Sequence, residues 1–337
     1  MKRRWVYGPV LSRRFGLSLG VDLVPAKLCS YDCVYCQVGK TTHLSVEPSH
    51  WVDVDEVLKD VEAAVGESGA PDVVTLAGSG DPTLYDALAP LMRGLREVAG
   101  APVVLLTNGG LLFREDVARA VEDADILAPS LDAGDPETFR KINRPHEAVT
   151  FDKMVQGLRQ VTQTFKGQVR VEVMLVRRIN DSPESIQAIS EVLSTLRVDR
   201  VDVNTPVRPV RGGEKMVCPR EVLERAARAF GPKASIVASR GSSKKIEGDA
   251  DSAPEKVYRR VKETISRRPC TAEEIGHSLR LRDVEVLKAL TRLRAEGVLV
   301  TREAPQRGGL GAAREDSSGE QEGQDSEVYY FVSESGG

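Results

Sequence analysis

The stretch from residue 72 to residue 107, DVVTLAGSGDPTLYDALAPLMRGLREVAGAPVVLLT, contains the pattern that decides the fold. Two short runs of apolar and β-branched residues, 72–77 and 102–107, flank a segment, 84–99, whose apolar residues recur with helical spacing. Strands that alternate with helices indicate a parallel sheet covered by helices. We therefore predict a strand–helix–strand unit over these residues.

The same alternation extends along the chain in both directions. The predicted strands are 19–24, 72–77, 102–107, 125–130, 169–176 and 201–204, with 235–238 as a seventh candidate. The predicted helices are 54–65, 84–99, 115–121, 152–164, 183–196 and 219–230. This α/β pattern over residues 1–238 predicts a partial (β/α)6 barrel, and a doubly wound sheet fits the same periodicity.

A change of composition separates the last third of the chain. Residues 239–253, SRGSSKKIEGDADSA, are small, polar and charged, and we interpret them as a linker. Beyond it, three short helices and two strands over 254–337 predict a small winged-helix domain. The predicted helices are 254–266, 271–279 and 283–296, the strands are 298–301 and 328–332, and the predicted disordered wing tip is 305–327.

Composition excludes several classes of protein. The 337 residues are 41% hydrophobic and 29% charged, with a net charge of −3, which is typical of a globular chain and not of a disordered or strongly nucleic-acid-binding one. The apolar run 101–106 is far shorter than the roughly 18 residues that span a bilayer. The basic N-terminus is not followed by a signal-peptide core. We expect a cytoplasmic protein with no membrane partner.

Three of the five cysteines lie together directly after the first predicted strand. Cys29, Cys33 and Cys36 have the spacing C-x3-C-x2-C, whereas Cys218 and Cys270 stand alone and are interpreted as structural. Cysteine thiolates are the usual ligands of iron–sulfur clusters, so three of them can hold three irons of a 4Fe–4S cluster. One iron would keep an open position.

Two other site types remain open on spacing alone. A structural zinc ion needs four ligands, and His43 could complete a Cys3His site in a zinc-binding winged-helix regulator. An electron-transfer iron–sulfur protein would need a fourth protein ligand for the cluster. Metal content and reactivity towards S-adenosylmethionine distinguish these alternatives.

The cysteine spacing, with the aromatic Tyr35 just before the last cysteine, resembles the signature of the radical S-adenosylmethionine (SAM) superfamily. The stretch YGPVLSRRFGLSLGVDLVPAKLCSYDCVYCQVGKTT, residues 7–42, is similar to the N-terminal block of iron–sulfur oxidoreductases related to the wybutosine-forming tRNA enzymes. The likeness covers roughly residues 5–240. It implies a radical SAM enzyme whose cofactors are a 4Fe–4S cluster and SAM.

The resemblance also implies where SAM binds. The GSGD segment after the second strand corresponds to a segment whose backbone contacts the SAM amino group, and small residues allow such close approach. Polar residues at the ends of later strands correspond to positions near the methionine carboxylate, the ribose and the adenine. The implied SAM-binding residues are Tyr35, Gly78, Ser79, Gly80, Asp81, Thr107, Asn108, Ser130, Asp132 and Asn204. For Asp132, the N-cap of a helix starting near Pro136 is an alternative role.

The substrate is less defined by the sequence. Archaeal wybutosine-forming enzymes carry further cysteines for a second cluster, and no second triad precedes Cys29, so we do not expect 4-demethylwyosine synthesis. A one-electron reductant of the flavodoxin or ferredoxin type is implied. Residues 254–300 carry eleven basic and seven acidic residues, which favours RNA modestly, while a peptide, a small molecule or a purely structural tail remain alternatives. Arg14 is a candidate contact for an anionic substrate, and Glu172 is a candidate to face the barrel lumen. No catalytic residue is assigned.

Overall fold

The computed structural model describes residues 5–206, 216–237, 254–267, 269–279, 281, 283–305 and 326–332. The chain separates into two compact units, residues 1–237 and 238–337, and each is described by itself. The predicted linker, 239–253, and most of the predicted wing tip, 305–327, lie outside the described residues.

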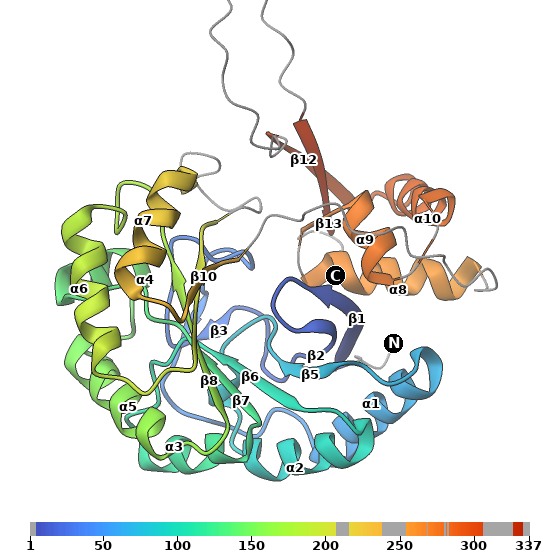
Figure 1. Ribbon diagram of the computed structural model, residues 1–337. Helices are drawn as coiled ribbons and strands as arrows, with labels where there is room; N and C mark the ends of the chain where they lie inside the picture. Colours follow the sequence, from blue (N-terminus) through green and yellow to red (C-terminus); the bar gives the residue numbers. More distant parts are fainter. Residues whose placement is uncertain are drawn as a thin grey trace, which may run out of the picture. The chain divides into compact units, whose positions relative to one another are not determined.

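The first unit is built on one eight-stranded sheet, with the central strands surrounded by helices (Figure 1). Its strands lie in the order β1 (Val6–Ser12), β2 (Gly16–Val21), β5 (Val73–Leu76), β6 (Val103–Thr107), β7 (Ile126–Pro129), β8 (Gln168–Met174), β9 (Arg200–Asn204) and β10 (Ala234–Ile236). From β2 to β10 all neighbours are parallel. Spatial order follows chain order, whereas a doubly wound sheet reverses its order at a switch point. The partial barrel is therefore confirmed.

Helices follow the strands and cover the outside of the sheet (Figure 1). They are α1 (Val54–Ser68), α2 (Leu88–Ala99), α3 (Glu115–Ala120), α4 (Pro136–Asn143), α5 (Phe151–Thr164), α6 (Pro183–Ser194) and α7 (Arg220–Phe230), with 3-10 turns η1 (Pro82–Leu84) and η2 (Val121–Asp123). The predicted helix 84–99 begins late, at Leu88, because Tyr85 has an extended backbone that ends η1. α6 starts as its sequence predicts, with Ser182 accepting from the Ser185 N–H and Pro183 in the first position.

An N-terminal hairpin, which the sequence did not predict, adds the antiparallel strand β1 to the edge of the sheet. The turn between β1 and β2 carries Arg14 and Phe15. Phe15 is buried in a small apolar cluster with Val73, Val104 and Ala128 from β5, β6 and β7. This cluster is separate from the larger core, so the hairpin fills part of the inner face of the barrel.

The two faces of the sheet differ in chemistry. Alternate residues of β8, such as Val171 and Val173, join the large core under the helices. The residues between them point to the other face. Those residues, Arg170 and Glu172, are charged and hydrogen-bond to charged or polar groups from the hairpin and from β9. The lumen is therefore polar on its β8–β9 side.

The second unit contains three helices and a small antiparallel sheet. The elements are α8 (Pro254–Arg267), β11 (Cys270–Thr271), α9 (Ala272–Leu279), α10 (Asp283–Ala295), β12 (Leu299–Pro305) and β13 (Ser326–Val332), and the strand order is β11-β13-β12. α9 starts with a capping box, because Thr271 and Glu274 each accept the other's backbone N–H. None of the helices described in either unit has the length and apolar character needed to cross a bilayer.

Candidate active site

The three clustered cysteines lie on one loop at the carboxyl end of β2. Cys29 ends the two-residue strand β3 (Leu28–Cys29), which pairs with β4 (His43–Leu44), and Cys33 and Cys36 follow in a turn closed by the Cys36 N–H donating to the Cys33 carbonyl at 3.1 Å. All three thiols are free and partly exposed. Ligands of parallel α/β barrels bind at this edge of the sheet.

Each of the three sulfurs already has an N–H donor. Asn108 Nδ2 lies 3.4 Å from the sulfur of Cys29, and Asn143 Nδ2 lies 3.5 Å from that of Cys33. Backbone N–H groups of the 38–39 segment face the sulfur of Cys36. Burial nevertheless raises the pKa of Cys29 to about 12 and that of Cys33 well above its usual value. Thiolates at these positions therefore need a bound cation, and the N–H donors are of the kind that stabilises sulfur ligands.

This arrangement fits a cluster better than a single metal ion. Within the part of the chain that the structure describes, no three His, Cys, Asp or Glu side chains converge closely enough to hold one ion. Zinc would need four ligands within about 2.3 Å of one point, whereas a 4Fe–4S cluster spreads its thiolates over separate irons. His43 is exposed on β4.

The glycine-rich turn after β5 packs directly against the cysteine loop. A Cβ atom on Gly80 would lie 1.9 Å from the Leu28 carbonyl oxygen, so only glycine fits there. Ser79 donates its N–H and its hydroxyl to the two carboxylate oxygens of Asp22, at 3.0 and 2.7 Å. A Cβ on Gly78 would in turn meet that carboxylate. The turn is thus held close to Cys29 by the carboxyl end of β2.

Asp81 joins the ends of β5 and β6. Its carboxylate caps η1 by accepting the Thr83 N–H at 2.9 Å, and it also accepts the Thr107 hydroxyl at 3.0 Å and the Asn108 N–H at 2.6 Å. Burial raises the pKa of Asp81 despite these donors. The structure therefore places Asp81 as a link that positions Asn108 beside Cys29. Contact between Asp81 and a SAM ammonium stays a prediction.

Asp132, at the end of β7, lies at the centre of a second network. One carboxylate oxygen accepts the Tyr35 hydroxyl and Asn143 Nδ2, the latter at 2.8 Å, and the other accepts the Met174 N–H at 2.9 Å. Burial raises the pKa of Asp132 to about 6, although the Tyr35 and Asn143 hydrogen bonds oppose that shift. The alternative role as a helix N-cap is wrong, because Asp135 caps α4. Asp132 instead connects Tyr35 to the residue beside Cys33.

Glu172 does face the lumen. It pairs with Arg14 at 2.7 Å and accepts Asn204 Nδ2 at 2.9 Å. Burial alone would raise the pKa of Glu172, but the Arg14 guanidinium and the Asn204 amide hold it below its usual value. The Ser130 backbone bridges to the same residue from β7. Arg14, predicted as a contact for an anionic substrate, is thus already paired with a carboxylate.

Sequence reasoning missed two residues of this site. Asn143 and Tyr31 are not among the residues predicted to form the site. The Tyr31 side chain is 2% exposed, and its hydroxyl has no hydrogen-bond partner in the part of the chain that the structure describes. The titratable groups that influence it include Cys33, Cys29 and Asp132. No periodicity in the sequence could reveal these contacts, because Asn143 is 110 positions from Cys33.

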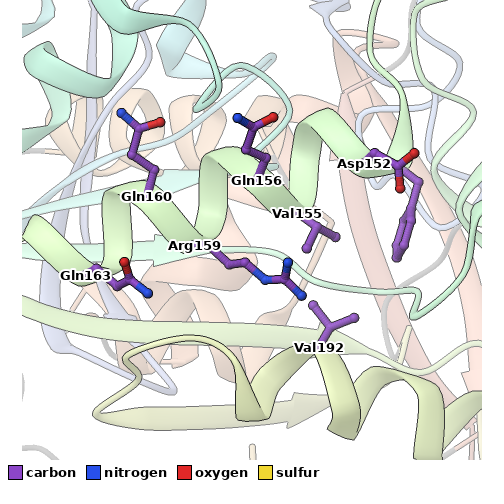
Figure 2. Close-up of a pocket in the computed structure, with 8 residues that line it drawn as sticks. Asp152, Val155, Gln156, Arg159, Gln160, Gln163 and Val192 are labelled. Carbon is purple, nitrogen blue, oxygen red and sulfur yellow. The ribbon is translucent and has the colours of Figure 1, made fainter.

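A separate groove of about 540 Å³ lies on the outer helical layer, between α5 and α6 (Figure 2). Its lining includes Gln156, Arg159 and Gln160 of α5 and Val192 of α6, and Arg159 already donates to the Thr195 hydroxyl at 2.8 Å. The groove contains none of the cysteines or strand-end residues described above. It is therefore distinct from the site at the barrel mouth.

Comparison with known proteins identifies the family. Residues 23–189 match the family model described as the radical SAM superfamily. A UPF0026 protein of Methanocaldococcus jannaschii is 35% identical over 218 residues, which cover 64% of this chain and 67% of that protein. The chain belongs to the radical SAM superfamily. Members of the superfamily use a 4Fe–4S cluster and SAM, so this chain is a radical SAM enzyme with those cofactors.

The chain is also similar to one further protein sequence and to one solved structure. A Brachyspira hyodysenteriae protein named GTPase Obg is 37% identical over 236 residues, which are 70% of this chain but only 35% of that protein. A solved structure of TYW1 with a lysine–pyruvate adduct bound has 17% identity and a TM-score of 0.51, covering 66% of this chain and 75% of that one. At this identity the TYW1 similarity shows the fold alone.

Proposed function

We propose that Cys29, Cys33 and Cys36 ligate three irons of the 4Fe–4S cluster and that SAM binds the open iron at the barrel mouth. Together the two cofactors would supply reductive cleavage of the SAM C5′–S bond, in which one electron from a flavodoxin- or ferredoxin-type reductant gives methionine and a 5′-deoxyadenosyl radical able to abstract hydrogen from a substrate. The observation that carries the proposal is the meeting of three free thiols, each with an N–H donor, at the carboxyl edge of a parallel barrel.

The surrounding residues have distinct tasks in this proposal. The backbone of the Gly78–Gly80 turn lies against the cysteine loop and can approach a SAM amino group closely. Asn108 donates a hydrogen bond to the sulfur of Cys29, and Asp132 accepts one from Asn143, the residue beside Cys33. The remaining proposed contacts for SAM are Tyr35 on the cysteine loop and three polar residues at strand ends, Thr107, Ser130 and Asn204. The barrel wall keeps water from the reacting atoms.

Single cysteine substitutions test the cluster assignment. We expect Cys29→Ala, Cys33→Ala and Cys36→Ala each to lose the 4Fe–4S signal of the anaerobically reconstituted protein. The buried Cys218 and Cys270 serve as matched controls, and their alanine variants should keep full iron and sulfide. Full iron in Cys33→Ala with an unchanged Mössbauer spectrum would overturn the assignment.

We further propose that the second unit is a winged-helix domain that binds an RNA substrate through α10. Supporting this, α10 exposes Lys288 and Arg294, and its last turn is basic. In the full-length protein, Lys288→Ala and Arg294→Ala should each weaken tRNA binding and reduce the slope of log K against log[salt] by about one. Unchanged affinity and slope in both variants would refute RNA binding by this helix.

A peptide substrate is the second candidate, and a different observation favours it. Val284 and Leu287 lie one turn apart on α10 and are 49% and 53% exposed. Exposed apolar side chains on a helix suit an apolar peptide face rather than phosphate. In the full-length chain, the double variant Val284→Ser/Leu287→Ser should then abolish peptide capture and leave tRNA binding unchanged. If α10 binds RNA instead, Lys288→Ala and Arg294→Ala should weaken tRNA binding and leave peptide capture unchanged.

A further inference from the structure

One buried polar group in the active site has no partner among the residues that the structure describes. Tyr31 is 2% exposed, yet its hydroxyl makes no hydrogen bond. A buried hydroxyl left unpaired is costly, and such groups are rare in folded proteins. The absence of a partner among the described residues therefore points to an acceptor that a bound group supplies.

The Tyr31 ring is held in place, so the hydroxyl is not unpaired through loose packing. Its ring contacts Phe139 edge-to-face, with centroids 5.5 Å apart. Gly110 lies against the other part of the ring, and a Cβ there would come within 2.6 Å of the ring and 2.8 Å of the hydroxyl oxygen. The Tyr31 carbonyl accepts the Thr41 hydroxyl at 2.7 Å. The backbone and the ring are thus both fixed between Cys29 and Cys33.

The neighbouring sulfurs of the protein already have donors. Asn108 donates to Cys29 at 3.4 Å, and Asn143 donates to Cys33 at 3.5 Å. The carboxylates near the hydroxyl are likewise engaged: Asp132 accepts three donors and Asp81 accepts from three residues. A phenol hydroxyl can donate one hydrogen bond. The sulfurs that a bound cluster would bring are acceptors of the kind that this hydroxyl lacks.

We propose that the Tyr31 hydroxyl donates a hydrogen bond to a sulfur of the bound 4Fe–4S cluster and thereby raises the reduction potential of that cluster. The proposal rests on the cluster ligation given above. Reduction adds negative charge to the cluster, so a donor to its sulfur stabilises the reduced state more than the oxidised state. Tyr31 therefore eases the electron transfer that must precede SAM cleavage.

The test is an EPR-monitored redox titration of the full-length, anaerobically reconstituted protein. Tyr31→Phe removes only the hydroxyl, and we expect an equal iron content with a midpoint potential shifted to a more negative value. Tyr85→Phe is the matched control, because Tyr85 is equally buried but its hydroxyl donates to the Val52 carbonyl at 2.7 Å; its midpoint should equal that of the wild type. A wild-type midpoint in Tyr31→Phe would overturn the proposal.

A second variant covers the case in which Tyr31→Phe does not take up a cluster. Gly110→Ala leaves Tyr31 in the chain but pushes its ring away, since the added Cβ would meet the ring at 2.6 Å. We expect the same negative shift, together with loss of an exchangeable-proton coupling to the reduced cluster in ENDOR spectra recorded before and after D2O exchange. An unchanged coupling would refute the role of Tyr31. A wild-type protein that binds no cluster would instead refute the proposed function.

Discussion

Asp81→Ala separates a structural role of this carboxylate from a purely cofactor-binding one. In the folded chain Asp81 is 4% exposed and accepts the Thr83 N–H, the Thr107 hydroxyl and the Asn108 N–H. Loss of an N-cap costs about 1 kcal/mol. The two donors from β6 and its end lose their acceptor as well, which adds roughly 2 kcal/mol when such groups are buried. We expect the free energy of unfolding to fall by about 3 kcal/mol without any SAM present.

The assay is anaerobic urea unfolding of the cluster-free protein, followed by far-UV circular dichroism. Asp135→Ala is the matched control, because Asp135 also caps a helix by accepting from Glu137 and Thr138 but is less buried and has no link to another strand. It should lose only about 1 kcal/mol. Equal losses of unfolding free energy in the two variants would refute the view that Asp81 links β5 to β6. Binding of SAM would then be the remaining role for Asp81.

Two further predictions concern buried carboxylates. Since the pKa of Asp132 is about 6 when folded and 3.8 when unfolded, the native state binds this proton more tightly, so stability falls as pH rises from about 4 to 6. We therefore compare the unfolding free energies of the cluster-free wild type and of Asp132→Asn. The wild-type value minus the variant value should drop by about 3 kcal/mol between pH 4 and 7. A difference that does not change with pH would contradict this prediction. Asp202→Ala leaves the buried Arg170, now 2.9 Å from that carboxylate, without its partner, and should lose about 3–5 kcal/mol in urea unfolding. The exposed ion pair of Glu115 and Arg119 is the control, because Glu115→Ala should lower the unfolding free energy by less than about 1 kcal/mol. Similar losses in Asp202→Ala and Glu115→Ala would count against a buried ion pair in the lumen.

Much of the barrel could be predicted because its central strands, β5 to β7, are buried on both faces. Such strands appear as continuous apolar runs, and β6 at Val103–Thr107 falls within the predicted 102–107. Local capping chemistry was equally readable, as Ser182 and Pro183 at the start of α6 show. The cysteine spacing likewise predicts a candidate site on this loop, because Cys29, Cys33 and Cys36 are close in sequence.

The hairpin and the hydrogen-bond networks could not be predicted in the same way. β1 contains Gly8 and Pro9 and forms the sheet edge, so its sequence has no strand-like periodicity. The neighbours of Cys33 arrive from segments about a hundred residues away, and nothing in the spacing of Asp132 or Asn143 indicates that they meet. Long-range contacts of this kind depend on the whole barrel having folded.

The most direct test of radical SAM chemistry in this chain is release of 5′-deoxyadenosine. The full-length protein, reconstituted anaerobically and incubated with SAM and a strong one-electron reductant, should release 5′-deoxyadenosine and methionine in equal amounts, and Cys33→Ala should release neither. No release from a wild-type protein that holds an intact, reducible 4Fe–4S cluster and is supplied with tRNA or peptide substrate would contradict the proposed function.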